Sequence, residues 1–156
     1  METSNLPINA PPPERVAHAA LRGGVAAMAM TGMRVLTTEL GLVEEPPPQA
    51  IFRQRARGLL RLVPRQRRRA AIELAHWGYG AGGGAAFALL PRGVRDQPWA
   101  GPAYGLAVWV GFEAVLAPLL GLEQAKQPRP VERAALAADH LLYGFVLSEF
   151  RRRPRD

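Results

Sequence analysis

The sequence predicts an all-α protein, a four-span transmembrane helical bundle, on three observations. Four apolar stretches fill most of the 156 residues, and each is close to the ~20 helical residues that cross a hydrocarbon core. Glycine is dense inside these stretches, which favours close packing of helices in lipid, because each Gly costs a soluble helix ~1 kcal/mol. Most basic residues flank the stretches. The stretches are 21–43, 70–90, 100–122 and 134–150.

The chain divides into a short arm, one helical domain and a basic tail. Residues 1–14 are Pro-rich and lack the basic start of a secretory signal, so a flexible arm is expected. Residues 15–150 form a single four-helix membrane domain, and residues 151–156 are a basic tail. A soluble helical bundle is the alternative, since short apolar runs also form buried core helices.

The composition excludes several chemistries. The chain has no cysteine, so disulfides, thiolate metal sites and a cysteine nucleophile are excluded. The net charge is +7, and the basic residues are all Arg except Lys126. Guanidinium groups suit phosphates, either of lipid headgroups or of nucleic acid.

The linker between the first two stretches predicts an amphipathic interfacial helix at about 49–63. One face carries Phe52, Ala56, Leu59, Leu60 and Val63. Arg53, Arg57 and Arg61 recur every fourth residue on another face and are expected to contact the anionic headgroups of membrane lipids. No aromatic residues alternate with these arginines, so we expect no nucleic-acid partner.

An internal repeat runs through the apolar stretches. The second contains His76–Gly80 and the fourth His140–Gly144, and both read HxxYG. The first and third match more loosely, as Gly-Met-Arg34 before Leu-Gly41-Leu and Gly-Phe-Glu113 before Leu-Gly121-Leu. These matches predict two helical hairpins arranged as a parallel repeat about an axis along the membrane normal.

The glycine run of the second stretch predicts a helix-packing face. Gly78 and Gly82 are four residues apart, as are Gly80 and Gly84. Small residues at this spacing let helix backbones approach closely. Such faces also fit a homo-oligomer or a partner in a larger membrane complex, so a structural or assembly subunit is the alternative function.

Ionisable residues of all four stretches are predicted to share one depth, forming a buried polar layer with two tyrosines. Arg34 and Glu113 occupy matching places in the repeat, and we expect them to face each other. Buried ionisable groups normally pair, line water or face the bundle interior. The layer comprises Arg34, Glu39, Glu73, His76, Tyr79, Glu113, Asp139, His140 and Tyr143.

The layer indicates a non-enzymatic protein that responds to or conducts protons or cations, because its carboxylates outnumber Arg34 and its imidazoles titrate near neutral pH. A purely structural layer that locks the helices together is equally compatible with the pattern. Glu73 and His76 have the ExxH spacing of dimetal helices, but the fourth stretch does not repeat it, so we expect neither metal nor cofactor. No catalytic triad or phosphate loop is present.

The pattern resembles the YagU-like family of small bacterial inner-membrane proteins, mostly of unknown function. The residues that carry the resemblance are Glu44–Pro48, Tyr104, Gly105, Trp109, Glu113, Pro118, Gly121, Leu122, Glu132 and His140–Gly144. The resemblance implies a multi-pass protein of the bacterial cytoplasmic membrane and brings no catalytic residues with it.

Overall fold

The protein is all-α, as the sequence predicts. A computed structural model describes residues 12–43, 51–52, 54–55, 58, 61–121 and 129–149, and these residues form helices and turns with no strand among them. The long helices are α1 (Pro13–Glu39), α4 (Arg68–Leu89), α6 (Ala100–Gly111) and α8 (Pro130–Glu149). The short segments are η1 (Arg65–Arg67), α5 (Arg92–Arg95), a π-helical turn η2 (Phe112–Leu116) and α7 (Ala117–Leu119).

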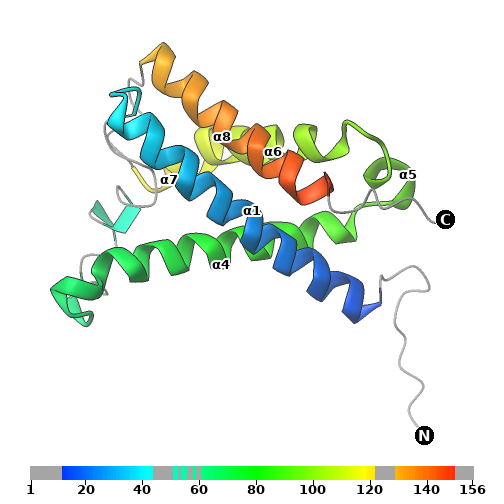
Figure 1. Cartoon of the computed structure of the whole chain (residues 1–156), viewed down its shortest axis with the longest axis horizontal. Helices are drawn as coiled ribbons and strands as arrows, with labels where there is room; N and C mark the ends of the chain where they lie inside the picture. Colours follow the sequence, from blue (N-terminus) through cyan, green and yellow to red (C-terminus); the bar gives the residue numbers. More distant parts are fainter. Residues whose placement is uncertain are drawn as a thin grey trace, which may run out of the picture.

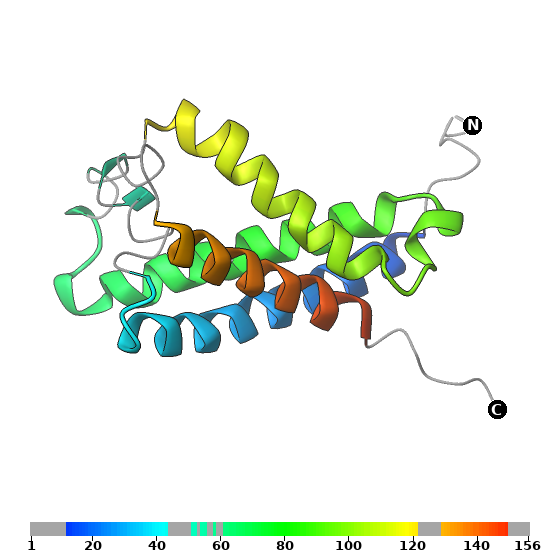
Figure 2. The ribbon, with the colours of Figure 1, turned by 90° about the horizontal axis from the view of Figure 1, so that it is seen from above.

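The helices form two antiparallel hairpins that pack through α1 and α8 (Figure 1). Helix α1 packs along α4, and α6 packs along α8. The start of α1, the end of α8 and α5 lie together at one end of the bundle. Figure 2 shows that the segment from α6 to α7 diverges from α4 toward the opposite end.

Two helices begin earlier than their apolar stretches. Helix α1 begins at Pro13, so the last residues assigned to the arm are helical, and α8 begins at Pro130. Proline is favoured in the first turn because its missing N–H has no helical acceptor there. Charged residues such as Arg15 and Arg133 lie outside the apolar stretches but inside the helices. The rest of the arm and the basic tail lie outside the described residues.

The crossing of α1 and α4 has no room for side chains. A Cβ atom at Gly23 would clash with the carbonyl oxygen of Gly80, and one at Gly84 would clash with that of Ala19. Backbone therefore contacts backbone at these positions. The packing role predicted for Gly78 and Gly82 is wrong within this chain, because a Cβ at either residue would meet open space.

The crossing of α6 and α8 is built in the same way. A Cβ at Gly101 would clash with the carbonyl oxygen of Gly144, and one at Gly105 with that of His140. Gly101 and Gly105 have the same four-residue spacing as Gly80 and Gly84, but the sequence analysis predicted a packing role for neither. The glycines of both HxxYG segments thus lie where each helix crosses the first helix of its own hairpin.

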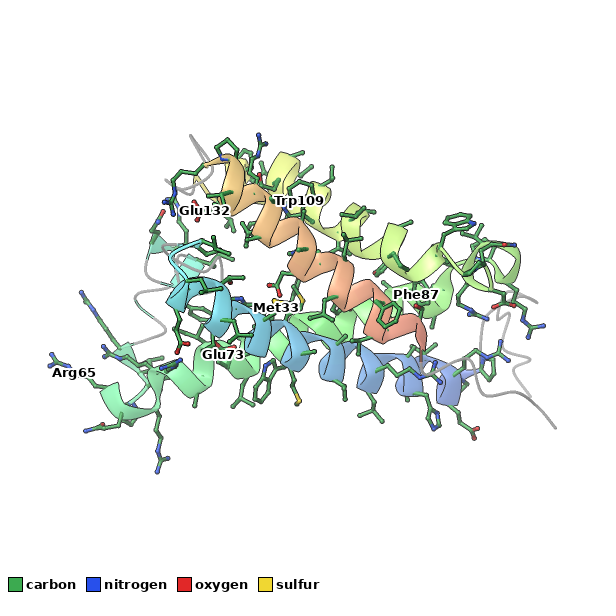
Figure 3. The ribbon with its side chains drawn as sticks, turned by 45° about the horizontal axis from the view of Figure 1, so that its top comes forward. Met33, Arg65, Glu73, Phe87, Trp109 and Glu132 are labelled. Carbon is green, nitrogen blue, oxygen red and sulfur yellow. The ribbon has the colours of Figure 1, made fainter. Side chains whose placement is uncertain are left out.

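The core joins the two hairpins. Phe87, Tyr143 and Leu147 are fully or nearly fully buried at its centre, and Phe87 lies between helices of both hairpins (Figure 3). The Tyr143 hydroxyl donates a hydrogen bond to the carbonyl oxygen of Gly80 at 2.7 Å. The Tyr104 hydroxyl donates likewise to Gly83, also at 2.7 Å. These two bonds attach the second hairpin to the backbone of α4.

Both Leu-Gly-Leu segments end helices. Gly41 and Gly121 have φ angles of 68° and 54°, a left-handed conformation that only glycine adopts at low cost. The Gly41 N–H donates to Thr38 and the Leu42 N–H to Thr37, which is the Schellman pattern. The loose match between the first and third stretches therefore includes a shared helix terminator.

The π-helical turn η2 precedes Pro118. Proline lacks an N–H and its ring clashes with the carbonyl four residues earlier in a regular helix. The Ala117 N–H bonds to Phe112, five residues back, which widens the turn and relieves this clash. The apolar segment therefore continues unbroken through η2 from Ala100 to Leu119. Among the described residues it is the one helical segment that is long and apolar enough to cross a bilayer.

Substitution of Gly84 by Ala is expected to lower the free energy of unfolding by ~1–3 kcal/mol, because the added methyl group forces α1 and α4 apart. Gly82→Ala in the same helix is the matched control. It faces open space and is expected to be neutral or stabilising by up to ~1 kcal/mol. Denaturant unfolding followed by circular dichroism measures both, and equal effects would contradict the proposed crossing.

Candidate functional site

Arg34 is the centre of a buried polar cluster. It lies on α1 with 6% of its surface exposed, and Asp139 on α8 is 4% exposed. The Arg34 Nε atom lies 3.7 Å from Asp139 Oδ2. The Arg34 Nη2 group donates a hydrogen bond to His76 Nε2 on α4 at 3.0 Å. One guanidinium group thus joins three helices from both hairpins.

The hydrogen bonds fix the tautomers of the two repeat histidines. Arginine has only donors, so His76 Nε2 is the acceptor and His76 carries its proton on Nδ1. His140 Nδ1 lies 2.8 Å from the carbonyl oxygen of Leu136, which can only accept. His140 therefore also carries its proton on Nδ1, and its Nε2 keeps a lone pair that can accept a proton or a hydrogen bond.

The cluster lines a pocket of about 200 Å³ between the hairpins. Arg34, His76, Asp139 and His140 form its polar part. The remaining wall comes from α1, α4, η2, α8 and the linker after α1. It consists of Met30, Ile51, Phe52, Ala75, Tyr79, Phe112, Leu116 and Leu136. The pocket is thus a mostly apolar chamber with ionisable groups from three helices.

Several buried atoms of this cluster have no hydrogen-bond partner among the described residues. They are Nε and Nη1 of Arg34, Nδ1 of His76 and Oδ1 of Asp139. A buried polar atom without a partner costs ~1–3 kcal/mol. These residues line the pocket, where water molecules can satisfy such atoms.

Glu113 does not pair with Arg34, which corrects the sequence prediction. Its Oε2 lies 3.5 Å from Nε of Arg133 on α8, and the Glu113 side chain is 16% exposed. The reason is the helix order, since α8 packs against both α1 and α6. Asp139 on α8 therefore reaches Arg34, while Glu113 meets the outer turn of the same helix.

Two other carboxylates predicted for the layer lie away from the pocket. Glu39 is exposed near the end of α1. Glu73 accepts a hydrogen bond from the Thr31 hydroxyl at 2.9 Å, and that hydroxyl accepts one from Trp77 Nε1 at 3.1 Å. Figure 3 shows Glu73 beside α1. The predicted excess of carboxylates is therefore wrong for the pocket, where Asp139 faces Arg34.

The two repeat tyrosines have different surroundings. Tyr143 is buried in the core, whereas Tyr79 is 57% exposed at the edge of the pocket. The Tyr143 hydroxyl reaches across to the other HxxYG segment through Gly80. The reverse contact, from Tyr79 to Gly144, is absent among the described residues, since the Tyr79 side chain is exposed.

The described residues include no group of three or more His, Asp or Glu side chains placed to hold a metal ion. Within the ExxH segment, Glu73 accepts from Thr31 and His76 from Arg34. The two side chains therefore engage separate partners on α1.

The Arg-rich linker is described only in part. Arg53 and Arg57 lie outside the described residues, and Arg61 is exposed. Arg55, which the sequence pattern did not single out, donates hydrogen bonds from Nε to the carbonyl oxygen of Leu120 and from Nη2 to that of Gly121. Carbonyl groups at a helix end attract cations, so Arg55 fastens the linker to the end of α7.

Comparisons with protein-family models, with curated proteins and with solved structures each found no match. The assignment of a function therefore depends on the geometry of this pocket.

Substitution of Asp139 by Ala leaves Arg34 buried without a counter-charge and is expected to lower the free energy of unfolding by ~3–5 kcal/mol. Glu113→Ala is the matched control. Its partner Arg133 is 57% exposed, so the expected loss is below ~1 kcal/mol. Denaturant titration of both variants in one detergent provides the measurement, and a loss for Asp139→Ala as small as that of the control would contradict the role of the pair.

Proposed function

We propose that the chain is a multi-pass protein of the bacterial inner membrane whose Arg34–His76–Asp139–His140 pocket responds to or conducts protons. The observation that carries the proposal is the combination of many outward-facing apolar side chains with a buried cluster of ionisable groups. Ionisable groups are buried at the pocket, while large apolar side chains face outward. Water-soluble proteins have the opposite arrangement, and their exposed apolar patches are small.

The outward apolar side chains come from every long helix. Only 11% of the most apolar window of Ala100–Leu119 is buried inside the bundle. The core helix of a soluble protein would be mostly buried, so lipid contact supplies the missing cover. The exposed apolar residues of the long helices and of the η2–α7 segment include Leu21, Val25, Met28, Val35, Leu36, Leu74, Leu89, Val110, Val115, Leu119, Leu141 and Phe145.

The helix lengths support four spans. Helix α1 has 27 residues, α4 has 22 and α8 has 20, which correspond to ~30–40 Å at 1.5 Å per residue. The matching glycine crossings of the two hairpins support their proposed origin as a parallel repeat. Arg53, Arg57 and Arg61 are proposed to contact anionic headgroups.

The chemistry of the pocket favours protons over metal cations. The Arg34 guanidinium neutralises Asp139 and repels a second cation. His140 Nε2, with its lone pair, is the proposed proton acceptor, and Asp139 is the second site. A proton on Asp139 would remove the charge that holds Arg34. Protonation is therefore coupled to the contact between α1 and α8.

An assembly subunit remains the second candidate function, and one observation favours it. Gly78 and Gly82 face open space on α4, although glycine is costly in a helix without close packing. A second copy or another membrane helix could pack there.

Cysteine-accessibility mapping tests the membrane location, since the native chain has no cysteine. Val25→Cys, Val110→Cys and Leu141→Cys lie outward in mid-helix. They are expected to resist a membrane-impermeant maleimide, while Arg65→Cys and Arg92→Cys at opposite ends of α4 react from opposite sides. Rapid labelling of the mid-helix positions, with the protein in the soluble fraction, would refute the proposal. Disulfide dimers of Gly82→Cys would favour the assembly function.

Proton flux tests the pocket. In liposomes that enclose a pH dye, the wild type is expected to dissipate a pH gradient, and Asp139→Asn and His140→Ala to fall to the rate of protein-free liposomes. Glu113→Gln neutralises a carboxyl group outside the pocket and should retain the flux. A wild type no faster than empty liposomes, or Asp139→Asn as fast as the wild type, would exclude proton conduction.

A further inference from the structure

A second pocket lies at the other end of the bundle, where α1 begins and α4 and α8 end. Its volume is about 340 Å³. Arg15 and Arg22 on α1 and Arg95 on α5 supply positive charge. Phe87 and Leu147 form an apolar floor and are almost fully buried. The pocket therefore combines guanidinium groups with a hydrophobic base.

Arg15 and Arg22 are available to a ligand. They lie seven residues apart, which is about two helical turns, so they share one face of α1. Both are half-buried, and within the described part of the chain neither guanidinium group has a hydrogen bond or an ion pair. A half-buried guanidinium group loses hydration, and an anion in the pocket would compensate for that loss.

Arg95 is held in place by the protein. Its Nη1 donates to the carbonyl oxygen of Ala88 at 2.6 Å, and its Nε lies 3.7 Å from Asp96 Oδ1. The Asp96 side chain is 59% exposed, so it neutralises Arg95 only weakly. His18, which also lines the pocket, adds no acidic group. The described residues that line the pocket thus include three arginines and no carboxylate.

We propose that this pocket binds the phosphate group of an anionic phospholipid. Arginine forms paired hydrogen bonds with phosphate, and basic pockets between membrane helices bind lipid headgroups. The floor of Phe87 and Leu147 can contact the glycerol and acyl parts of a lipid. Inorganic phosphate has no apolar part that would contact this floor. This inference rests on the proposed membrane location and concerns the end of the bundle opposite Arg61.

Lipid retention provides the test. The protein is reconstituted in nanodiscs of equal parts phosphatidylglycerol and phosphatidylcholine, and native mass spectrometry counts the lipids that stay bound. The wild type is expected to retain phosphatidylglycerol selectively. In the double variant Arg15→Gln/Arg22→Gln, the preference for phosphatidylglycerol over phosphatidylcholine is expected to fall about 30-fold. Each arginine near an anionic headgroup raises the affinity for that lipid by a factor of about five. The double variant Arg15→Lys/Arg22→Lys keeps the charge but loses the paired hydrogen bonds. Its preference for phosphatidylglycerol is expected to lie between those of the wild type and the Gln variant.

Arg65→Gln/Arg67→Gln is the matched control, since it removes the same charge from exposed residues at the other end of α4. It is expected to keep the wild-type preference. An equal loss in this control, or no preference in the wild type, would overturn the site. Displacement of the lipid by millimolar inorganic phosphate would overturn the lipid as ligand. Cysteine mapping reports the membrane location separately, so failure of the pocket and failure of the proposed function are distinguishable.

Discussion

The buried contact of Arg34 with Asp139 and His76 is the interaction on which the bundle depends. Removing a charge from water costs several kcal/mol, so an arginine with 6% exposure is stable only where partners surround it. Asp139 supplies the opposite charge and His76 supplies an acceptor. The three residues come from α1, α8 and α4. The position of each helix at this level is therefore fixed by one side chain.

Close backbone contact also fixes the positions of the helices, at the level of the bundle where Gly80 lies. Gly80 touches α1, and its carbonyl oxygen also receives the hydrogen bond of Tyr143. The glycine of one HxxYG segment thus receives the tyrosine of the other. This arrangement is asymmetric, because Tyr79 is exposed where Tyr143 is buried. The divergence of α6 from α4 accounts for the difference and leaves the space that the Arg34 pocket occupies.

The two pockets use arginine in opposite ways. Arg34 is enclosed by an acid and two imidazoles, so its charge is neutralised inside the protein. Arg15 and Arg22 are half-buried beside an apolar floor and keep their charge for a ligand. Under the membrane proposal, the first pocket lies within the bundle and the second at the lipid headgroups. A proton site and a lipid site in one small bundle would let the surrounding membrane influence the helices that hold Asp139.

The sequence by itself determined the helices and much of their local chemistry. Apolar stretches with interior glycine specified the long helices, and proline and Leu-Gly-Leu specified several of their ends. His76 and His140, which the sequence analysis assigned to one polar layer, both line the Arg34 pocket. These features depend on neighbours within a few residues, which a linear pattern records. The apolar-stretch boundaries nevertheless misplaced the start of α1, because a helix can continue through charged residues such as Glu14 and Arg15.

Only the tertiary structure decided which polar groups meet. Arg34 and Glu113 match in the repeat, yet α8 packs against both α1 and α6 and supplies Asp139 to one and Arg133 to the other. Gly78 and Gly80 are equally small, yet the rotation of α4 about its axis turns only Gly80 toward α1. Partner choice depends on the order and rotation of helices that are far apart in the chain. The order and the rotation of the helices follow from the packing of the whole bundle, so they cannot be predicted from the sequence of any single segment.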